Sequence, residues 1–357
     1  MKLLKSAALL TAGIVFGSAL WAEGLKVSGY IRSGVEADLD DSSMQSQTYD
    51  DGYFYGVAKS RLRVNVKYDQ ENYGLTFRYQ ASKFGLLNKS SFDESGDLVS
   101  NTNTSFCIAD NLKWAQGYAK LFNGLVVAEG GLLKDTYTAS TGFEGYDFSD
   151  YYGGVAGARL VVLPVQGLAL SFQASSLYSE VYDATSSKKG KTKLNENLFS
   201  ASASYANDVF SVAGGYHFAG EGYASFGLYA VKDLTLQIEA DYLSKDLTGS
   251  DDASTTLVEN IEYDIKDANL SLGVVSYEYF AEDTAFDIYP YARIGFLENY
   301  AATLEAGFHN DGDSDTDDNI SVTPSVSAFA GKAEVKAYFT YNTEGNAKTG
   351  INVKVSF

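Results

Sequence analysis

The sequence contains very little cysteine, proline and histidine. Its 357 residues include 1 Cys, 3 Pro and 2 His. The single Cys107 excludes an intramolecular disulfide framework, and we expect it to be an inert structural thiol. His217 and His309 lie far apart, in no catalytic or metal-binding spacing. The sequence therefore predicts neither an enzyme nor a resident cofactor.

Basic charge is also scarce. Lys and Arg number 27 against 46 Asp and Glu, a formal net charge of −19, which argues against a nucleic-acid partner because phosphates attract basic proteins. The acidic segment 311–319, DGDSDTDDN, offers carboxylates to calcium. It fails the EF-hand pattern, since Asp318 stands where Gly is needed and Pro324 where Glu is needed. We expect no metal site and interpret this segment as a solvated loop.

Long hydrophobic runs are absent beyond the first residues. A transmembrane helix needs about 20 apolar residues, and no such stretch occurs, so a helical membrane protein is excluded. The run from Ala7 to Leu20 follows Lys2 and Lys5 and ends in small residues at Ala22, which is the layout of a secretory signal. We expect residues 1–22 to be a cleaved signal peptide and residues 23–357 to form one exported domain.

The residues that are abundant suit β-strands. The chain has 34 Gly, 27 Tyr and 21 Phe, and from Gly24 onward polar and apolar residues alternate in segments of about ten. In KSRLRVNVKY, which runs from Lys59 to Tyr68, basic residues and Asn65 share one face while Leu, Val and Tyr share the other. This period of two predicts strands with one apolar and one polar face.

The predicted connections are of two kinds. Short ones occur at 71–74, 122–124, 164–167, 207–208 and 232–233, and long ones at 39–56, 84–111, 135–152, 180–196 and 245–254. A soluble β-sandwich also alternates, but its connections are similar at its two ends. We therefore predict an all-β fold: a single transmembrane antiparallel β-barrel of about 16–18 strands, with long outer loops, short periplasmic turns and both termini on the periplasmic side.

The C-terminal segment GINVKVSF ends in an aromatic residue. Ile351, Val353, Val355 and the terminal Phe357 alternate with polar residues. This end resembles the insertion signal of bacterial outer-membrane barrels, which implies the barrel-assembly machinery as a partner. The alternative is an ordinary half-buried strand. With the predicted signal peptide, the segment indicates export to the cell outer membrane, with outer-membrane lipid around the barrel.

The mature chain resembles the general bacterial porins in layout, with an opening strand at 24–36, tight inner turns, long outer loops and the final amphipathic strand. In that family the third outer loop narrows the barrel, and its acidic residues face basic residues on the wall. The resemblance implies that Glu144, Asp147 and Asp150 are the constriction-loop acids. The implied pore-lining basic ladder comprises Arg32, Lys59, Arg61, Arg63, Lys67, Arg78 and Arg159. The alternative is a lumen lining that is simply polar and wet.

The resemblance implies a porin, a water-filled channel for passive diffusion of ions and small hydrophilic solutes. A channel selective for sugars or peptides and an adhesin or structural barrel acting through its surface loops remain alternatives. Inward serines favour an open lumen. Tyr30, Tyr289, Tyr291 and Tyr338 also fall on the inward parity, and we interpret them as a membrane-edge girdle rather than a sugar-binding track. Porins of this kind often form homotrimers, but the outward residues here single out no contact band.

Overall fold

The structure is a computed structural model. It describes residues 24–40, 43–46, 61–81, 90–92, 98–101, 112–134, 154–176, 198–248, 252–281, 284–312 and 319–357. The predicted signal peptide, Lys59 of the predicted ladder, and the predicted constriction-loop residues Glu144, Asp147 and Asp150 lie outside these residues.

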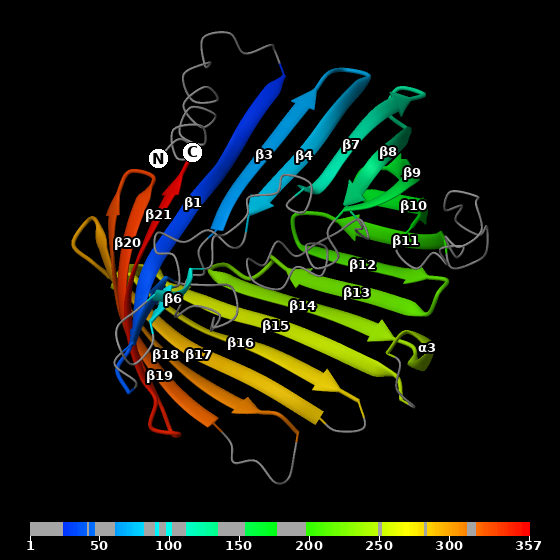
Figure 1. The fold of residues 1–357 in the computed structure, drawn as a ribbon. Helices are drawn as coiled ribbons and strands as arrows, with labels where there is room; N and C mark the ends of the chain where they lie inside the picture. The colour runs from blue at the N-terminus through cyan, green and yellow to red at the C-terminus, as the bar shows by residue number, and fades with distance from the viewer. Residues whose placement is uncertain are drawn as a thin grey trace.

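The described chain forms a closed antiparallel barrel of 18 strands, each hydrogen-bonded to its neighbours in the ring (Figure 1). The predicted all-β barrel is thus confirmed, with the larger of the two expected strand numbers. The barrel strands are β1 (Leu25–Asp38), β3 (Arg61–Asp69), β4 (Tyr73–Ala81), β7 (Leu112–Leu121), β8 (Val126–Lys134), β9 (Gly154–Val165), β10 (Leu168–Ser175), β11 (Phe199–Ala206), β12 (Phe210–His217), β13 (Glu221–Leu228), β14 (Leu234–Leu243), β15 (Ser254–Ile265), β16 (Leu270–Phe280), β17 (Thr284–Phe296), β18 (Tyr300–Asn310), β19 (Asn319–Ala330), β20 (Ala333–Asn342) and β21 (Ala347–Ser356).

The first and last strands close the ring. β1 pairs antiparallel with β21 along nine residue pairs, from Tyr30 with Ser356 to Asp38 with Lys348. Beyond that ladder, the backbone N–H of Phe357 donates to the carbonyl of Gly29, and the N–H of Gly29 donates back to the carbonyl of Phe357. Figure 1 shows the red C-terminal strand beside the blue N-terminal one. Because the ring is closed, the barrel has no unpaired strand edge.

The period of two gives the wall two faces. On β21 the outward residues Ile351 and Val353 are 52% and 43% exposed, whereas Asn352 between them is 3% exposed and faces the lumen. The same alternation separates outward Ile31 from inward Tyr30 on β1. An exterior of exposed, large apolar side chains around a polar interior is the surface that a lipid bilayer requires.

The connections follow the predicted division only in part. All eight connections at one end are short, at 70–72, 122–125, 166–167, 207–209, 229–233, 266–269, 297–299 and 331–332. At the other end the first four are long, at 39–60, 82–111, 135–153 and 176–198, and carry the short strands β2 (Ser43–Ser46), β5 (Ser90–Phe92) and β6 (Leu98–Asn101). The predicted long connection at 245–254 is confirmed at 244–253, whereas the other later connections at this end, at 218–220, 281–283, 311–318 and 343–346, are shorter.

Two of the short turns are tied together by an ion pair. The 3-10 turn η4 (Lys266–Ala268) places the Lys266 ammonium on the carboxylate of Asp233, in the turn before β14. The hydrogen bond and the charge of Asp233 raise the pKa of Lys266 above its ordinary value. At the opposite end, a single helical turn, α3 (Lys245–Thr248), follows β14. Within the described ranges, no helix combines the length and the apolar character needed to cross a membrane.

Candidate functional site: the charged walls of the lumen

Four basic side chains of the predicted ladder come together on the lumenal face of β1, β3 and β4. Arg32 on β1 lies directly opposite Arg61 on β3 in the antiparallel register, and Arg63 lies opposite Tyr30. Arg78 on β4 lies opposite Asn65 of β3. We call Arg32, Arg61, Arg63, Arg78 and the neighbouring Lys354 the basic wall.

Lys354 was not among the predicted site residues. The closure of the ring places it on β21 directly opposite Arg32, so the basic wall continues across the join between the two ends of the chain. Lys354 already stood on the polar face of the C-terminal strand in the sequence. The rule that a barrel pairs its last strand with its first would have identified it.

Neutral groups orient the guanidinium groups of the basic wall. The Nε of Arg63 donates to Gln80 Oε1 at 2.7 Å, and the Nε of Arg78 donates to Asn65 Oδ1 at 2.6 Å. The Arg78 guanidinium lies 4.0 Å from the ring centroid of Trp114. These partners of Arg63 and Arg78 are uncharged, and they fix the direction of the two side chains.

Tyr30 lies at the centre of the basic wall. Arg32, Arg63 and Lys354 lie 5.8, 5.6 and 5.1 Å from its ring centroid. Arg61 Nη1 donates to its hydroxyl at 3.3 Å. The ring therefore contacts cations from three neighbouring strands, and it spaces like charges that would otherwise repel one another.

Two further residues of the predicted ladder lie elsewhere. Lys67 faces the lumen opposite Lys26, near the short-turn end, where its ammonium is 3.4 Å from Asp69. Arg159 on β9 forms a short ion pair with Glu129 on β8, 2.5 Å from Nε to Oε2, and also donates to Gln173. The exposed fractions of the Arg159 and Glu129 side chains are only 8% and 14%. Arg159 is thus part of a separate, charge-paired section of the wall.

Acidic residues lie half a turn around the ring from the basic wall. In the ring of 18 strands, β13 lies directly across the barrel from β1, and β14 lies directly across from β3. Their lumenal faces carry Glu221, Glu239 and Asp241, which are 1%, 2% and 6% exposed. We call these three residues the acidic wall. Glu221 and Asp241 lie near the ends of their strands that lead to the outer connections, as Arg61 does on β3, whereas Lys354 lies near the opposite end of β21.

The interpretation of the inward tyrosines as a membrane-edge girdle is wrong. Tyr30, Tyr289, Tyr291 and Tyr338 are between 4% and 8% exposed, on the lumenal face. Tyr338 lies over Gly350 of the next strand and donates to Glu36 at 2.7 Å, and Tyr291 lies over Gly273 and donates to Glu262 at 2.5 Å. A glycine opposite each ring provides space for it against the wall. Parity predicted their side of the wall correctly, but not this packing.

The remaining lumenal surface is small and polar where the sequence predicted it. Ser171 Oγ and Ser202 Oγ are hydrogen-bonded at 2.6 Å across β10 and β11. Ser325 and Ser327 lie on the lumenal face of β19, opposite Tyr338 and Lys336. No group of three or more His, Cys, Asp or Glu side chains is arranged to hold a metal ion within the residues that the structure describes.

A closed barrel with an apolar exterior and a charged, polar interior defines a fold class: the porin-like β-barrel. Solved structures share this fold. OpdQ of Pseudomonas aeruginosa is 9% identical with a TM-score of 0.52, and the match covers 94% of this chain and 99% of OpdQ. OccAB3 of Acinetobacter baumannii is 11% identical with a TM-score of 0.52 and covers 94% and 100% of the two chains.

The outer membrane protein opdK of Pseudomonas aeruginosa also has a TM-score of 0.52, at 9% identity, with 94% and 100% of the two chains covered. At such low identity these likenesses show the fold alone. No family model matches the chain, and no curated protein matches it either.

Proposed function

We propose that the protein is an outer-membrane channel for passive diffusion of ions and small hydrophilic solutes. The observation that carries the proposal is the opposition of the basic wall on β21, β1, β3 and β4 to the acidic wall on β13 and β14. Opposed charges across a lumen create a field that orients polar solutes and biases which ions pass. A barrel of 18 strands is wider than its own wall side chains fill.

The basic wall is the part of the lumen that we expect to set ion selectivity. Reversing the charge of Arg61 and Arg63 to Glu should raise the cation-to-anion permeability ratio. The measurement is the reversal potential of the purified protein in planar bilayers under a salt gradient. Because surface charges are screened over about 10 Å at 0.1 M salt, the shift should shrink as salt rises.

The chain offers a matched control for this experiment. Lys26 and Lys67 form a cross-strand pair on the same two strands, face the lumen and are exposed near the short-turn end. Reversing both to Glu changes the net charge by the same amount as R61E/R63E. We expect a clearly smaller shift from the Lys pair. Equal shifts would mean that total charge, not the basic wall, sets selectivity.

A channel selective for anionic solutes is the second candidate, favoured by the oriented guanidinium groups and the ring of Tyr30 in the basic wall. It predicts that one class of anionic solute blocks the salt current at concentrations where neutral sugars do not. The predicted constriction at Glu144, Asp147 and Asp150 would narrow the lumen further and remains a prediction, as do the homotrimer and the cleaved signal peptide.

We also propose that Ile351, Val353, Val355 and Phe357 form the signal read by the barrel-assembly machinery. Support comes from the exposed outward side chains of Ile351, Val353 and Val355 and from the hydrogen bonds between Phe357 and Gly29 at the join. The expected location is the outer membrane, where the apolar exterior contacts lipid.

A further inference from the structure

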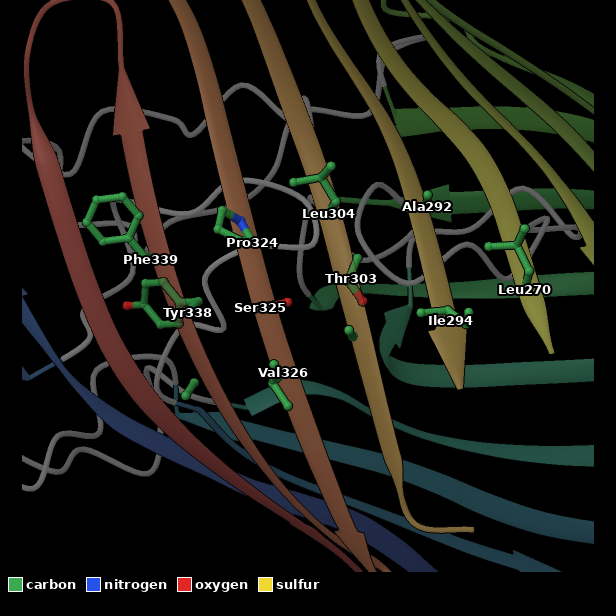
Figure 2. Close-up of a pocket in the computed structure, with 12 residues that line it drawn as sticks. Leu270, Ala292, Ile294, Thr303, Leu304, Pro324, Ser325, Val326, Tyr338 and Phe339 are labelled. Atoms are coloured by element: carbon green, nitrogen blue, oxygen red, sulfur yellow. The ribbon is translucent and has the colours of Figure 1, made fainter. Parts of the chain in front are cut away.

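The outward face of the barrel is hollowed over β16 to β20 (Figure 2). The hollow is a groove of about 600 Å³ whose lining atoms are almost all apolar. It arises from the register: Ala302 lies between Ile294 and Val326 on the neighbouring strands, and Val326 pairs with Ala337. Small and large residues thus alternate across the strands. Its walls include Ala292, Ile294, Ala302, Leu304, Ala337 and Phe339.

One end of the groove lies near the short turn between β17 and β18. Phe296 and Tyr300 flank the turn between β17 and β18, and their rings stack with centroids 5.9 Å apart. Aromatic residues at strand ends mark the level of lipid headgroups in membrane barrels. The next outward residues along these two strands are Ile294 and Ala302, which line the groove. The groove therefore opens from the headgroup level at the short-turn end into the hydrocarbon.

A positive charge lies on the short-turn side of the groove. Lys332 is in the two-residue turn that joins β19 and β20, two of the strands that form the groove. It is exposed, and it forms no ion pair within the described ranges. Four residues separate Val326 and Ala337 from the strand ends at this turn. With a strand rise of about 3.3 Å per residue and a strand tilt near 45°, the turn lies roughly 10 Å from Val326 and Ala337 along the barrel axis, toward the short-turn end.

We infer that this groove binds one acyl chain of an anionic glycerophospholipid from the periplasmic leaflet, whose phosphate pairs with Lys332. In hydrocarbon an unfilled hollow loses dispersion contacts along its whole lining, so a flexible chain that fills it is held more firmly than its neighbours on a flat wall. The ammonium adds a charge-assisted hydrogen bond to the phosphate. The inference rests on the membrane placement with the short turns inside, and not on conduction through the lumen.

Native mass spectrometry of the full chain, released from mild detergent, tests the assignment. Phosphatidylglycerol and phosphatidylcholine with the same acyl chains are the probes. The unmodified protein should retain one phosphatidylglycerol in preference to phosphatidylcholine. Ala302→Phe, which fills the groove, should abolish retention of both lipids. Lys332→Glu should keep the binding of phosphatidylcholine and lower the affinity for phosphatidylglycerol about tenfold.

Ala203→Phe is the matched control, because Ala203 is an exposed outward alanine on β11, outside the groove. It should retain phosphatidylglycerol like the unmodified protein. Retention by A302F at the unmodified level, or equal loss in A203F, would overturn the inference. So would a mass of two chains that disappears in A302F, since a second copy would then cover the groove.

Heat-modifiable migration on gels verifies folding, and unchanged conductance of A302F separates this result from the proposed channel function.

Discussion

At the scale of single residues, charge on the lumenal wall is handled in two ways. In the basic wall, the uncharged side chains of Gln80, Asn65 and Trp114 contact the guanidinium groups of Arg63 and Arg78. On β8 and β9, Glu129 neutralises Arg159 directly. The first arrangement orients the cations through uncharged groups, and the second contributes to the stability of the wall.

The ion pair between Arg159 and Glu129 gives a prediction about stability. Removing one partner of a largely buried pair leaves a charge without compensation and costs about 3 kcal/mol or more. Arg159→Met should therefore lower the free energy of unfolding by this order, while the double variant E129Q/R159M should recover much of the loss. Urea unfolding of the protein in lipid vesicles, followed by tryptophan fluorescence, measures both. A double variant no more stable than the single one would show that the pairing is not the cause.

The contacts of single side chains across strands could not be predicted from the sequence. Parity assigned Arg32, Arg61, Arg63 and Arg78 to the lumen, because a period of two leaves only two faces. It could not show that Arg159 would meet Glu129, since cross-strand partners depend on register and a shift of one residue changes every pair. The packing of Tyr291 over Gly273 depends on register in the same way.

At the scale of elements, the join between β1 and β21 determines both the closed ring and the extent of the basic wall. Gly29 lies at this join. A Cβ there would overlap the carbonyl oxygen of Arg63 and lie 2.8 Å from the ring of Phe357. The terminal aromatic residue can lie over the first strand because that strand has no side chain at this position.

Gly29→Ala should therefore weaken closure. The extra carbon forces a backbone shift, and overpacking of this kind costs about 1–3 kcal/mol. Gly117→Ala is the control, because a Cβ on this outward glycine would have only the Gly74 carbonyl oxygen nearby, at 3.8 Å. The fraction that runs as heat-modifiable, folded protein on gels, and its midpoint in urea, should fall for G29A and not for G117A. The reverse order would contradict the role assigned to the join.

Most strands and inner turns were predicted correctly from the sequence. Alternation located strands such as 61–69 and 234–243, and turn residues marked most of the inner hairpins, because both signals are local. The short outer connections at 218–220 and 281–283 were missed, since Phe218-Ala219-Gly220 carries only one turn residue and continues the apolar pattern.

At the scale of the whole molecule, closure of the ring places the basic wall and the acidic wall on opposite sides of the lumen. No residue pattern within one strand shows that β13 and β14 lie opposite β1 and β3; the strand count and the closure show it together. For this reason Glu221, Glu239 and Asp241 were absent from the predicted site, although each stands on a polar face in the sequence. The exterior belt and its groove over β16 to β20 emerge at this scale too.

The central claim is that the closed barrel encloses a water-filled path. Single-channel recording of the purified full chain in planar bilayers, across a series of KCl concentrations, tests it most directly. We expect discrete conductance steps that rise nearly in proportion to salt concentration, because ions cross a wet lumen without a saturable tight site. Insertion of folded protein without conductance steps at any salt concentration would contradict the claim.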